Sequence, residues 1–335
     1  MNPMARIDSS PKTVTFSPSF TLPLTRRCFN NCLYCGFRRA EGAVMDLAEV
    51  ESWLERACQK RSSEVLVIAG ERVDEVPEVR SRLREMGFED FVSYAAAVCR
   101  LALRKGVLPH TNIGVLDASS LALLREVNAS MGLMVENVDP DFGRGVHPHK
   151  IIARRQATIE DAGKLKIPFT TGILVGLGES SASRIRSLDW IAGVTRRYGH
   201  IQEVILQNYV PNRQSRLMAF PLALDEWADL IRLCREEMPE VKIQIPPNLN
   251  PLWSELILFG VDDLGGISGE IDYVNPRHPW ESIAFYREHF SRGSSALIPR
   301  LPLYREYYRK AWFSQTVKPV LETWVQRHEF RYYCQ

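Results

Sequence analysis

The chain has 335 residues, of which 45% are hydrophobic and 24% are charged, and 42 basic against 40 acidic side chains give a formal net charge of +2. These ordinary values exclude a long disordered arm and a strongly basic surface for nucleic acid. The longest apolar runs have the length of a strand, whereas a membrane span needs roughly 18 to 20 apolar residues. Because the N-terminus also lacks the apolar segment of a signal peptide, we expect a cytoplasmic protein with no membrane partner and no nucleic-acid partner.

Short apolar runs alternate with longer amphipathic stretches along most of the chain. Seven of these runs are predicted strands: 19–25, 64–70, 110–115, 132–138, 168–176, 203–210 and 241–247, with an eighth predicted within 257–266. The most strongly patterned helices span 45–61, with Asp46 as its N-cap, and 224–238. This repeated order of strand and helix predicts a parallel sheet and favours a (β/α)8 TIM-type barrel, closed or nearly so.

We find no Gly/Ser linker and no internal repeat, so we expect a single α/β domain with a C-terminal helical extension. The chain divides into an N-terminal extension (1–13), a core barrel (14–250) and a C-terminal part (251–335) that completes and covers the barrel. The end of this last part predicts two helices rich in aromatic residues, which would cover one end of the barrel.

Seven cysteines fall into one close group and four scattered positions. In a reducing compartment, grouped cysteines are more often metal ligands or catalytic groups than disulfides. We interpret the scattered ones as buried core thiols, because three of the four lie in apolar helical patterns. These scattered cysteines are Cys58, Cys99, Cys234 and, outside such a pattern, Cys334.

The grouped cysteines, Cys28, Cys32 and Cys35, directly follow the predicted strand 19–25. In a barrel this position is a loop at the C-terminal face, where active sites gather. A zinc site would need a fourth ligand, which His147 or His149 would have to supply. An iron–sulfur cluster makes fewer demands, because three thiolates leave one iron open for a substrate or cofactor.

The spacing C-x3-C-x2-C, with Tyr34 before the last cysteine, resembles the signature of the radical S-adenosylmethionine superfamily. The resemblance implies one 4Fe-4S cluster on the three cysteines. It also implies S-adenosylmethionine on the open iron, held by its amino and carboxylate groups. Reductive cleavage of this cofactor gives a 5′-deoxyadenosyl radical.

Three further stretches resemble cofactor-binding motifs of the superfamily. Gly70 and Glu71, after Ala69 in place of a usual glycine, match the motif that holds the methionine amino group, and a strand-ending turn is the alternative. The stretch 170–180 resembles the motif that flanks adenine, and a buried strand with a glycine turn and a helix N-cap at Ser180 is the alternative. Its matching residues include Gly172, Ile173, Leu174, Val175, Gly176 and Glu179.

Glu136 ends an otherwise apolar predicted strand and is our candidate for binding the ribose hydroxyls, with a capping or salt-bridged glutamate as the alternative. Four arginines bracket the cysteine group. They favour a negatively charged cluster or an acidic electron donor such as ferredoxin or flavodoxin, unless they simply form a solvated loop edge. They are Arg26, Arg27, Arg38 and Arg39.

Longer stretches at 125–139, 204–212, 245–251 and 260–280 resemble the deazaflavin-forming CofG family of this superfamily. The resemblance implies a lyase that closes the central ring of an adduct between a 4-hydroxybenzyl group and ribitylaminouracil, with loss of ammonia. A separate enzyme, CofH, would supply the adduct. The sequence departs from the family at Gly269–Glu270, which affects the expected geometry of one loop.

Two other readings remain open. CofH itself or a relative of biotin synthase would have a similar barrel, although the latter needs additional cysteines at strand ends. A zinc-binding protein without catalysis is the other.

Polar residues near the ends of predicted strands are candidates for binding such a substrate. For the uracil and ribityl groups they are Gln207, Asn208, Asn248 and Asn250. For the phenol they are Asp262, Asp263, Tyr273 and Asn275. None of them is marked by the sequence as the catalytic acid or base.

Overall fold

Parallel strands close into a barrel in the computed structural model, which describes residues 12–269, 271–293 and 295–334. The barrel strands run in sequence order around the ring, and the first pairs with both the second and the eighth. The predicted (β/α)8 barrel is therefore confirmed. Its strands are β1 (Thr13–Thr25), β2 (Glu64–Ala69), β3 (Leu108–Asn112), β4 (Ser130–Gly132), β5 (Phe169–Val175), β6 (Ile201–Asn208), β7 (Lys242–Gln244) and β8 (Asp263–Ile267).

Strand β1 is long enough to pair with three others. Its second half pairs with β2, its middle with β8, and its first residues with β9 (Ala296–Pro299), which lies outside the ring. All these pairings are parallel. The end of β1 leads directly into the loop that carries the three grouped cysteines.

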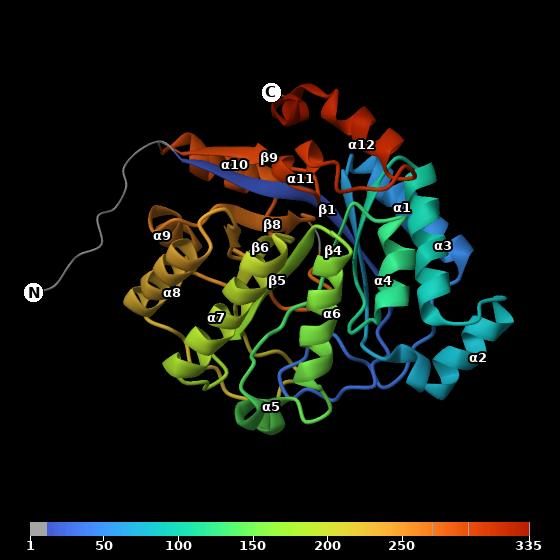
Figure 1. The fold of residues 1–335 in the computed structure, drawn as a ribbon, viewed down its shortest axis with the longest axis horizontal. Coiled ribbons are helices and arrows are strands. Elements are labelled where there is room, and N and C mark those ends of the chain that lie inside the picture. Colours follow the sequence, from blue (N-terminus) through green and yellow to red (C-terminus); the bar gives the residue numbers. More distant parts are fainter. Residues whose placement is uncertain (1–11, 270, 294, 335) are drawn as a thin grey trace, which may run out of the picture.

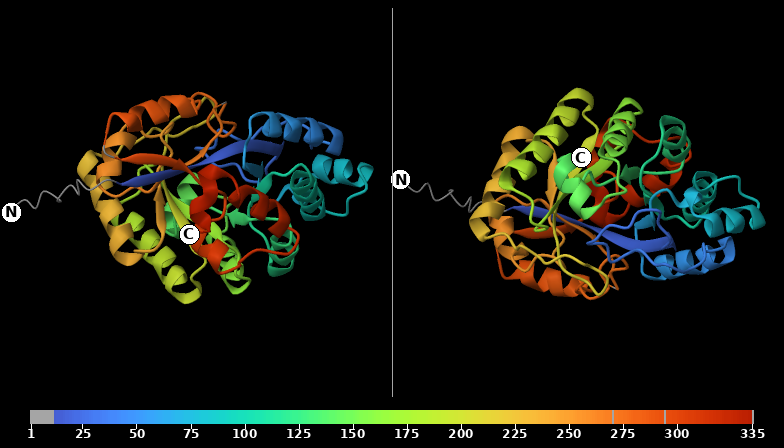
Figure 2. Two further views of the ribbon diagram at one scale, coloured as in Figure 1. Left: turned by 90° about the horizontal axis from the view of Figure 1, so that it is seen from above. Right: turned by 90° about the horizontal axis from the view of Figure 1, so that it is seen from below.

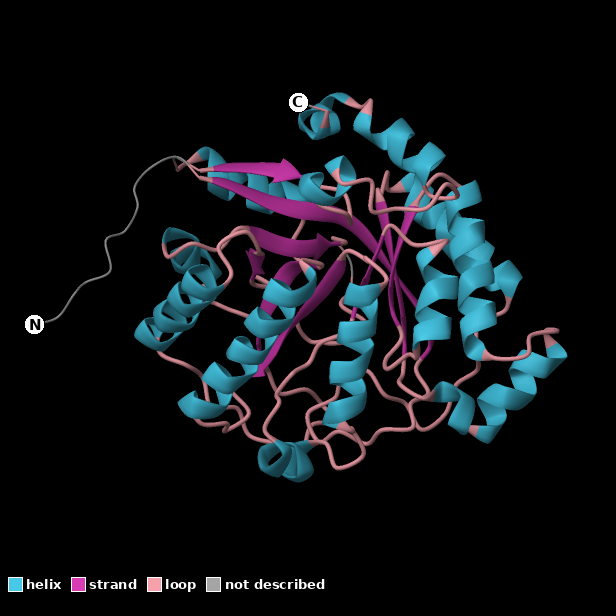
Figure 3. Ribbon diagram, in the orientation of Figure 1, coloured by secondary structure: helices cyan, strands magenta, loops and turns pink. Residues whose placement is uncertain are grey.

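Helices surround the strands, as Figure 3 shows. Those between strands are α1 (Leu47–Gln59), α2 (Pro77–Glu85), α3 (Phe91–Arg104), α4 (Ala118–Arg125), α5 (Pro140–Val146), α6 (Ile152–Lys164), α7 (Ser181–Tyr198), α8 (Leu224–Glu237), α9 (Trp253–Leu258) and α10 (Ile283–Ser291), with the 3-10 turn η1 (Val73–Glu75). The chain ends in α11 (Arg305–Arg309), α12 (Lys318–Val325) and the 3-10 segment η2 (His328–Tyr333). No helix in the described part of the chain is long and apolar enough to cross a membrane.

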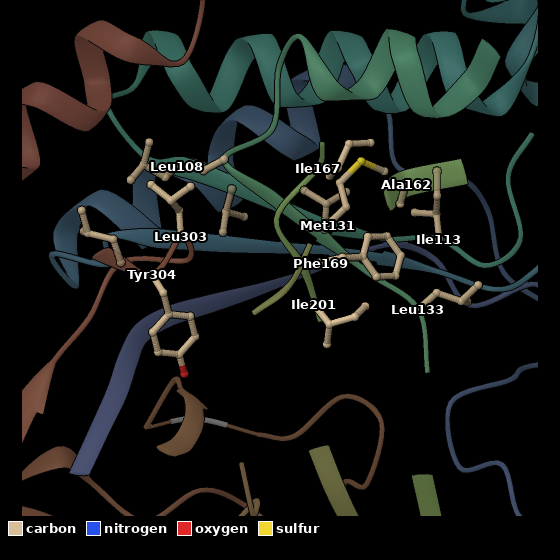
Figure 4. Close-up of a cluster of buried hydrophobic side chains, with 14 of the residues drawn as sticks. Leu108, Ile113, Met131, Leu133, Ala162, Ile167, Phe169, Ile201, Leu303 and Tyr304 are labelled. Carbon is tan, nitrogen blue, oxygen red and sulfur yellow. The ribbon is translucent and has the colours of Figure 1, made fainter. Parts of the chain in front are cut away.

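The main hydrophobic core lies between the strands and the helices. Figure 4 shows part of it, where Met131, Phe169 and Ile201 from three adjacent strands lie near Ala162 of α6. Leu303, from the chain after β9, belongs to the same cluster. The outward-facing side chains of the barrel thus build the core, which leaves its inward-facing side chains for a site.

The structure confirms the predicted helix cap and two of the predicted buried thiols. Asp46 caps α1 by accepting from the Glu49 backbone, as predicted. Cys99 and Cys234 are buried thiols in α3 and α8, also as predicted, but Cys58 is exposed. Cys58 follows the buried Ala57 directly, and because successive helical residues point about 100° apart, it turns away from the core. Cys334 is exposed as well.

The C-terminal elements cover the amino end of the barrel. Figure 1 shows α11 and α12 at the top of the molecule and α5, with the loops that follow the strands, at the bottom, and Figure 2 gives the view from either end. The carbonyl oxygen of Pro302 accepts from Ser130 at 2.6 Å and from Gln202 at 2.9 Å, both at the start of their strands. The aromatic helical extension therefore covers the end opposite the cysteine loop.

A buried ion network closes this end. Arg300 donates to Asp263 at 2.7 and 2.9 Å and to Glu203 at 2.9 Å, and Tyr304 donates to Glu203 at 2.7 Å. Burial raises the pKa of Glu203 to about 8, although Arg300 lowers it. At neutral pH the network is thus close to charge balance, with one guanidinium, one carboxylate and one protonated carboxyl group.

Three predictions need comment. The strand predicted over 132–138 is shorter and earlier, at β4, and continues only as an isolated bridge between Glu136 and Ile173. Most of the N-terminal extension and Glu270 lie outside the described residues. The division into 1–13, 14–250 and 251–335 stays a prediction.

Candidate active site

A cavity of about 260 Å³ lies where the strands end and the cysteine loop crosses them. Most of the predicted site residues come together in its wall, although they derive from β1, β2, β4, β5 and the loops after them. They are Cys28, Cys32, Tyr34, Cys35, Gly70, Glu71, Glu136 and Leu174. Gly172 and Gly176 are not among its lining residues.

Backbone groups hold the cysteine loop against the end of β2. The Glu71 amide donates to the Cys28 sulfur at 3.2 Å, and the Arg38 amide donates to the Cys35 sulfur at 3.4 Å. Gly70 is needed for this contact, because a Cβ there would lie 1.9 Å from the Arg27 carbonyl oxygen. The small residue that the sequence motif requires thus serves the approach of the two loops.

The arrangement of the three cysteine thiols suits an iron–sulfur cluster better than a single metal ion. In the described residues, no three His, Cys, Asp or Glu side chains gather as the ligands of a single metal ion would. His147 faces Glu136 at 3.6 Å, and the ring of His149 packs on that of Phe29. This geometry disfavours the zinc alternative, whereas a cubane takes each thiolate on a different iron.

Burial raises the pKa of the Cys32 thiol to about 12, although nearby Lys150 lowers it. Burial raises the pKa of Cys28 as well. A thiolate is the form that binds metal. Thiolates at these positions therefore need a strongly positive partner, and iron supplies one.

Beside the thiols lies a network of buried charges centred on Glu136. Tyr34 and Lys150 both donate to its carboxylate, and Arg155 lies 3.6 Å from it. Burial would raise the pKa of Glu136, but Lys150, Arg155 and His147 outweigh burial and lower it to about 2. Burial lowers the pKa of His147 to about 4, so the network contains a firmly ionised carboxylate beside a neutral histidine.

Glu136 is also held in an unusual backbone conformation. Its φ of 66° is rare for a residue other than glycine. Its amide donates to the Gly172 carbonyl at 2.9 Å, and its own carbonyl accepts from Leu174 at 3.1 Å. Such conformations persist where surrounding bonds fix them, and they gather at functional sites. Gly172 therefore acts on the site through Glu136, from outside the cavity wall.

Glu71 is fully engaged by its neighbours. Its carboxylate accepts from Arg155 and, at 2.9 Å, from Asn30. Arg155 also donates to the Met134 carbonyl at 2.9 and 2.6 Å, which fixes the guanidinium at the cavity wall. Nothing in the sequence pointed to Lys150 or Arg155, since one lies in a loop and the other in a helix without a motif.

The stretch after β5 forms a tight turn beside the cavity. Gly176 and Gly178 have φ values of 91° and 94°, and the buried Glu179 carboxylate accepts from the Gly176 amide at 3.0 Å. Ser180 caps α7, as its alternative reading predicted. Leu174 packs with Leu177 and Tyr209 into a small apolar cluster, against which Tyr34 also packs. This cluster gives the cavity one apolar wall.

Each of the four arginines donates a hydrogen bond to a backbone carbonyl group of the cysteine loop. Arg26 donates to the Phe37 and Tyr273 carbonyls at 2.9 and 3.0 Å, Arg38 donates to the Cys28 carbonyl at 3.4 Å, and Arg27 pairs with Glu78 at 2.9 Å. Arg39 donates to Gly36 and Gln214 at 2.9 and 2.8 Å. All four are half-buried. The four side chains thus border solvent and also bind backbone carbonyl groups of the loop.

A second cavity, of about 190 Å³, continues from the first into the barrel. Both cavities are lined by Asn112, Met134, Gln207, Val274 and Asn275. Of the candidates for substrate binding, Gln207 and Asn275 thus lie between the cavities, Asn208 lines the first and Asn248 the second.

Two candidates for holding a phenol are placed wrongly by the sequence. Asp262 pairs with Arg235, and Asp263 with Arg300, because β8 begins at Asp263 and both carboxylates lie at the amino end of the barrel. Tyr273 and Asn250 are not among the lining residues of either cavity. The error has a simple cause, since the predicted strand had been placed up to six residues too early.

Known proteins share the sequence pattern and the fold of this chain. The model of the radical SAM superfamily matches residues 22–191. Solved structures show the same fold: the hydrogenase maturase HydG from Carboxydothermus hydrogenoformans, at 19% identity and a TM-score of 0.68, over 97% of this chain and 82% of that one. Methylornithine synthase, PylB, has 14% identity and a TM-score of 0.67 over 90% and 86%.

Curated relatives share much more of the sequence. Proteins named 7,8-didemethyl-8-hydroxy-5-deazariboflavin synthase are 42% identical in Archaeoglobus fulgidus, over 93% of this chain and 96% of the relative, and 43% identical in Methanoculleus marisnigri, over 94% and 96%. The relative from Methanococcoides burtonii is 39% identical over 96% and 98%. The chain belongs to the radical SAM superfamily and, within it, to the family of these CofG-type deazariboflavin synthases.

Proposed function

We propose that this protein is a radical SAM lyase that forms 7,8-didemethyl-8-hydroxy-5-deazariboflavin. Its substrate would be 5-amino-5-(4-hydroxybenzyl)-6-(D-ribitylimino)-5,6-dihydrouracil, which loses ammonia as the central ring closes. The observation that carries the proposal is a cavity with three thiols that opens into a polar barrel interior. The names of relatives that match over nearly the whole chain support it.

Membership of the superfamily implies S-adenosylmethionine and an iron–sulfur cluster. We assign one 4Fe-4S cluster to Cys28, Cys32 and Cys35, which fits three half-buried thiols that line one cavity. When bound, cluster and cofactor together supply one-electron chemistry that ends in a 5′-deoxyadenosyl radical.

The charges of the first cavity suit the two ends of the cofactor's methionine group. Arg155 and Lys150 would hold its carboxylate, because both are buried cations at the cavity wall. Gly70 and Glu71, at the end of β2, would receive its ammonium group. To bind the ammonium group, the Glu71 carboxylate has to share its hydrogen bond from Arg155 or give it up.

The remaining cofactor groups would lie along the other wall. The ionised Glu136 would accept hydrogen bonds from the ribose hydroxyls. Leu174 and Tyr34 would cover the adenine, since they belong to the apolar side of the cavity. The turn with Gly176, which lies outside the lining residues, would support this wall together with Gly172.

The partners follow from the same assignment. CofH would supply the substrate, and an electron donor such as ferredoxin or flavodoxin would reduce the cluster. Cys32 and Cys35 also line a surface hollow of about 290 Å³ with Arg38 and Arg216, where an acidic donor would find positive charge close to the sulfurs. The reducing cytoplasm is the expected compartment for such thiols.

The test is an anaerobic assay of the purified, reconstituted protein with the CofH product, S-adenosylmethionine and a reductant. We expect brown protein with about four irons per chain, and a fluorescent deazaflavin that forms together with 5′-deoxyadenosine. Colourless protein that binds zinc would overturn the proposal. So would 5′-deoxyadenosine formed with a different product from the same adduct.

A further inference from the structure

Two polar side chains at the mouth of the inner cavity are left without a hydrogen bond to another described residue. The side chains of Asn112 and Gln207 make no hydrogen bond to any residue in the described ranges, and both lie where the two cavities meet. Deeper in the barrel, the inner cavity is lined by His110, Glu64, Thr170 and Gln244. Polar groups inside a protein are normally paired, so the unpaired amides of Asn112 and Gln207 indicate a polar ligand.

His110 is the clearest case, because its hydrogen bonds fix its tautomer. Its Nδ1 lies 2.7 Å from the Ser130 hydroxyl, and that hydroxyl donates its one hydrogen to the Pro302 carbonyl at 2.6 Å. Ser130 can therefore only accept from His110, so Nδ1 carries the hydrogen. Burial lowers the pKa of His110. The ring is thus neutral, and Nε2 is left as an acceptor with a free lone pair.

The structure also keeps space beside this nitrogen. Gly132 faces it, and a Cβ at that position would lie only 2.9 Å from Nε2. No donor among the described residues lies within hydrogen-bond distance of Nε2. A neutral imidazole with a lowered pKa is a poor proton acceptor but a good hydrogen-bond acceptor, so the site suits a hydroxyl or an N–H group that keeps its proton.

We infer that the inner cavity around His110 binds the polyhydroxyl chain of the substrate, with a hydroxyl group donating to His110 Nε2. This inference rests on the proposed function and adds the orientation of the substrate to it. Each hydroxyl both donates and accepts. The cavity offers a matching acceptor, because the Glu64 carboxylate accepts from Ser17 and Ser19 and still has lone pairs for a further hydrogen bond.

The chemistry of the proposed substrate gives the orientation. We take the benzylic carbon, which joins the phenol to the uracil, as the carbon from which the 5′-deoxyadenosyl radical abstracts hydrogen, so both rings have to lie close to the cofactor cavity. The ribityl chain leaves the uracil through the nitrogen on C6, next to the C5 that carries the benzyl group. It is the one long flexible substituent of the substrate, so it is the part that can extend from the rings into the inner cavity. Asn112, Gln207 and Asn275 then lie at the level of the rings, where amides match the N–H and C=O groups of uracil.

The experiment compares the natural adduct with an analogue that carries a pentyl chain in place of ribityl. For the wild type we expect kcat/KM for the ribityl adduct to exceed that for the pentyl adduct by about tenfold to a hundredfold, since a hydrogen bond is worth about two- to tenfold. Equal values for the two adducts would overturn the inference without the need for any variant.

Two variants of His110 sharpen the test. His110→Asn keeps an amide at the position of Nδ1 but loses the acceptor at Nε2, and should lower the preference for the ribityl adduct by about tenfold. His110→Gln restores an acceptor near Nε2 and should regain most of the preference. The matched control is Gln207→Leu, which should lower turnover of both adducts alike.

A fall of kcat/KM by the same factor for both adducts in His110→Asn would contradict the assignment. The cluster spectrum should match that of the wild type in both His110 variants, because His110 does not line the cofactor cavity. A wild type that makes no deazaflavin from either adduct would instead count against the proposed function, so the two failures are distinguishable.

Discussion

Arg300 and Arg155 are buried guanidinium groups at opposite ends of the barrel, and each lies between two carboxylates. Arg300 binds Asp263 and Glu203, and a tyrosine completes the network. Arg155 binds Glu71 and lies 3.6 Å from Glu136. Similar residues thus build two different structures.

The two networks differ in their net charge and in whether a ligand can reach them. At the amino end the network is near neutrality, because Glu203 holds its proton up to a pKa of about 8. At the cysteine end a second cation, Lys150, joins the network, and the pKa of Glu136 falls to about 2. The first network is suited to closing a barrel. The second keeps its charges beside a cavity, where a charged ligand can exchange with them.

The largest effect should follow from Cys32→Ala, which acts on the cysteine end alone. We expect no iron–sulfur absorption and no measurable deazaflavin, because two thiolates no longer hold the cluster. The unfolding free energy of the iron-free protein should stay within about 1 kcal/mol of the wild type, since the loop lies outside the core. Iron analysis and urea unfolding measure both. Cys58→Ala, at an exposed thiol, is the control and should keep the cluster.

Arg300→Met should have the largest effect on stability. The change leaves Asp263 and Glu203 buried without their cation, and breaking such a pair costs about 3 to 5 kcal/mol. Urea unfolding measures the loss. Arg292→Met, which removes an exposed pair with Glu288, should cost no more than about 0.5 kcal/mol. Equal losses in the two variants would show that the network at the amino end does not stabilise the fold.

Arg155→Met should weaken cofactor binding by about 10- to 100-fold, because a charged hydrogen bond to the carboxylate is worth about 1.5 to 3 kcal/mol. Its cost in stability should be smaller than that of Arg300→Met, since Lys150 still pairs with Glu136. Titration of the reconstituted protein with S-adenosylmethionine gives the affinity. Arg154→Met, exposed on the same helix, is the control. Unchanged affinity together with a large loss of stability would assign Arg155 a structural role only.

The smallest effect should appear in the pH dependence of stability. A carboxyl group with a raised pKa in the fold stabilises it below the unfolded pKa, and this stability is lost as the pH rises to the folded pKa. For Glu203 the window runs from 4.5 to about 8. Glu203→Gln stays neutral, so between pH 5 and pH 9 it should lose less stability than the wild type, by about 1 kcal/mol or more. Parallel pH curves for both proteins would contradict this.

The two ends also differ in how well the sequence predicted them. Strands and main helices follow from apolar periodicity, and the cysteine group stood out by its spacing alone. The contacts of Arg155 and Lys150 could not be predicted from the sequence, because these residues lie in a helix and a loop and meet Glu136 only in the closed barrel. Asp263 was assigned to the wrong end of its strand, since an aspartate at the start of a buried strand has the same sequence neighbours as one at its end.

The pairing of β1 has a consequence for the order of assembly. This strand is made first, yet two of its three neighbours, β8 and β9, lie near the other end of the chain. One edge of β1 therefore stays open during synthesis, and an open edge is prone to pair with other chains. The loop to which we assign the cluster follows this strand, so the barrel end that carries it is complete only after β8 and β9 have paired with β1.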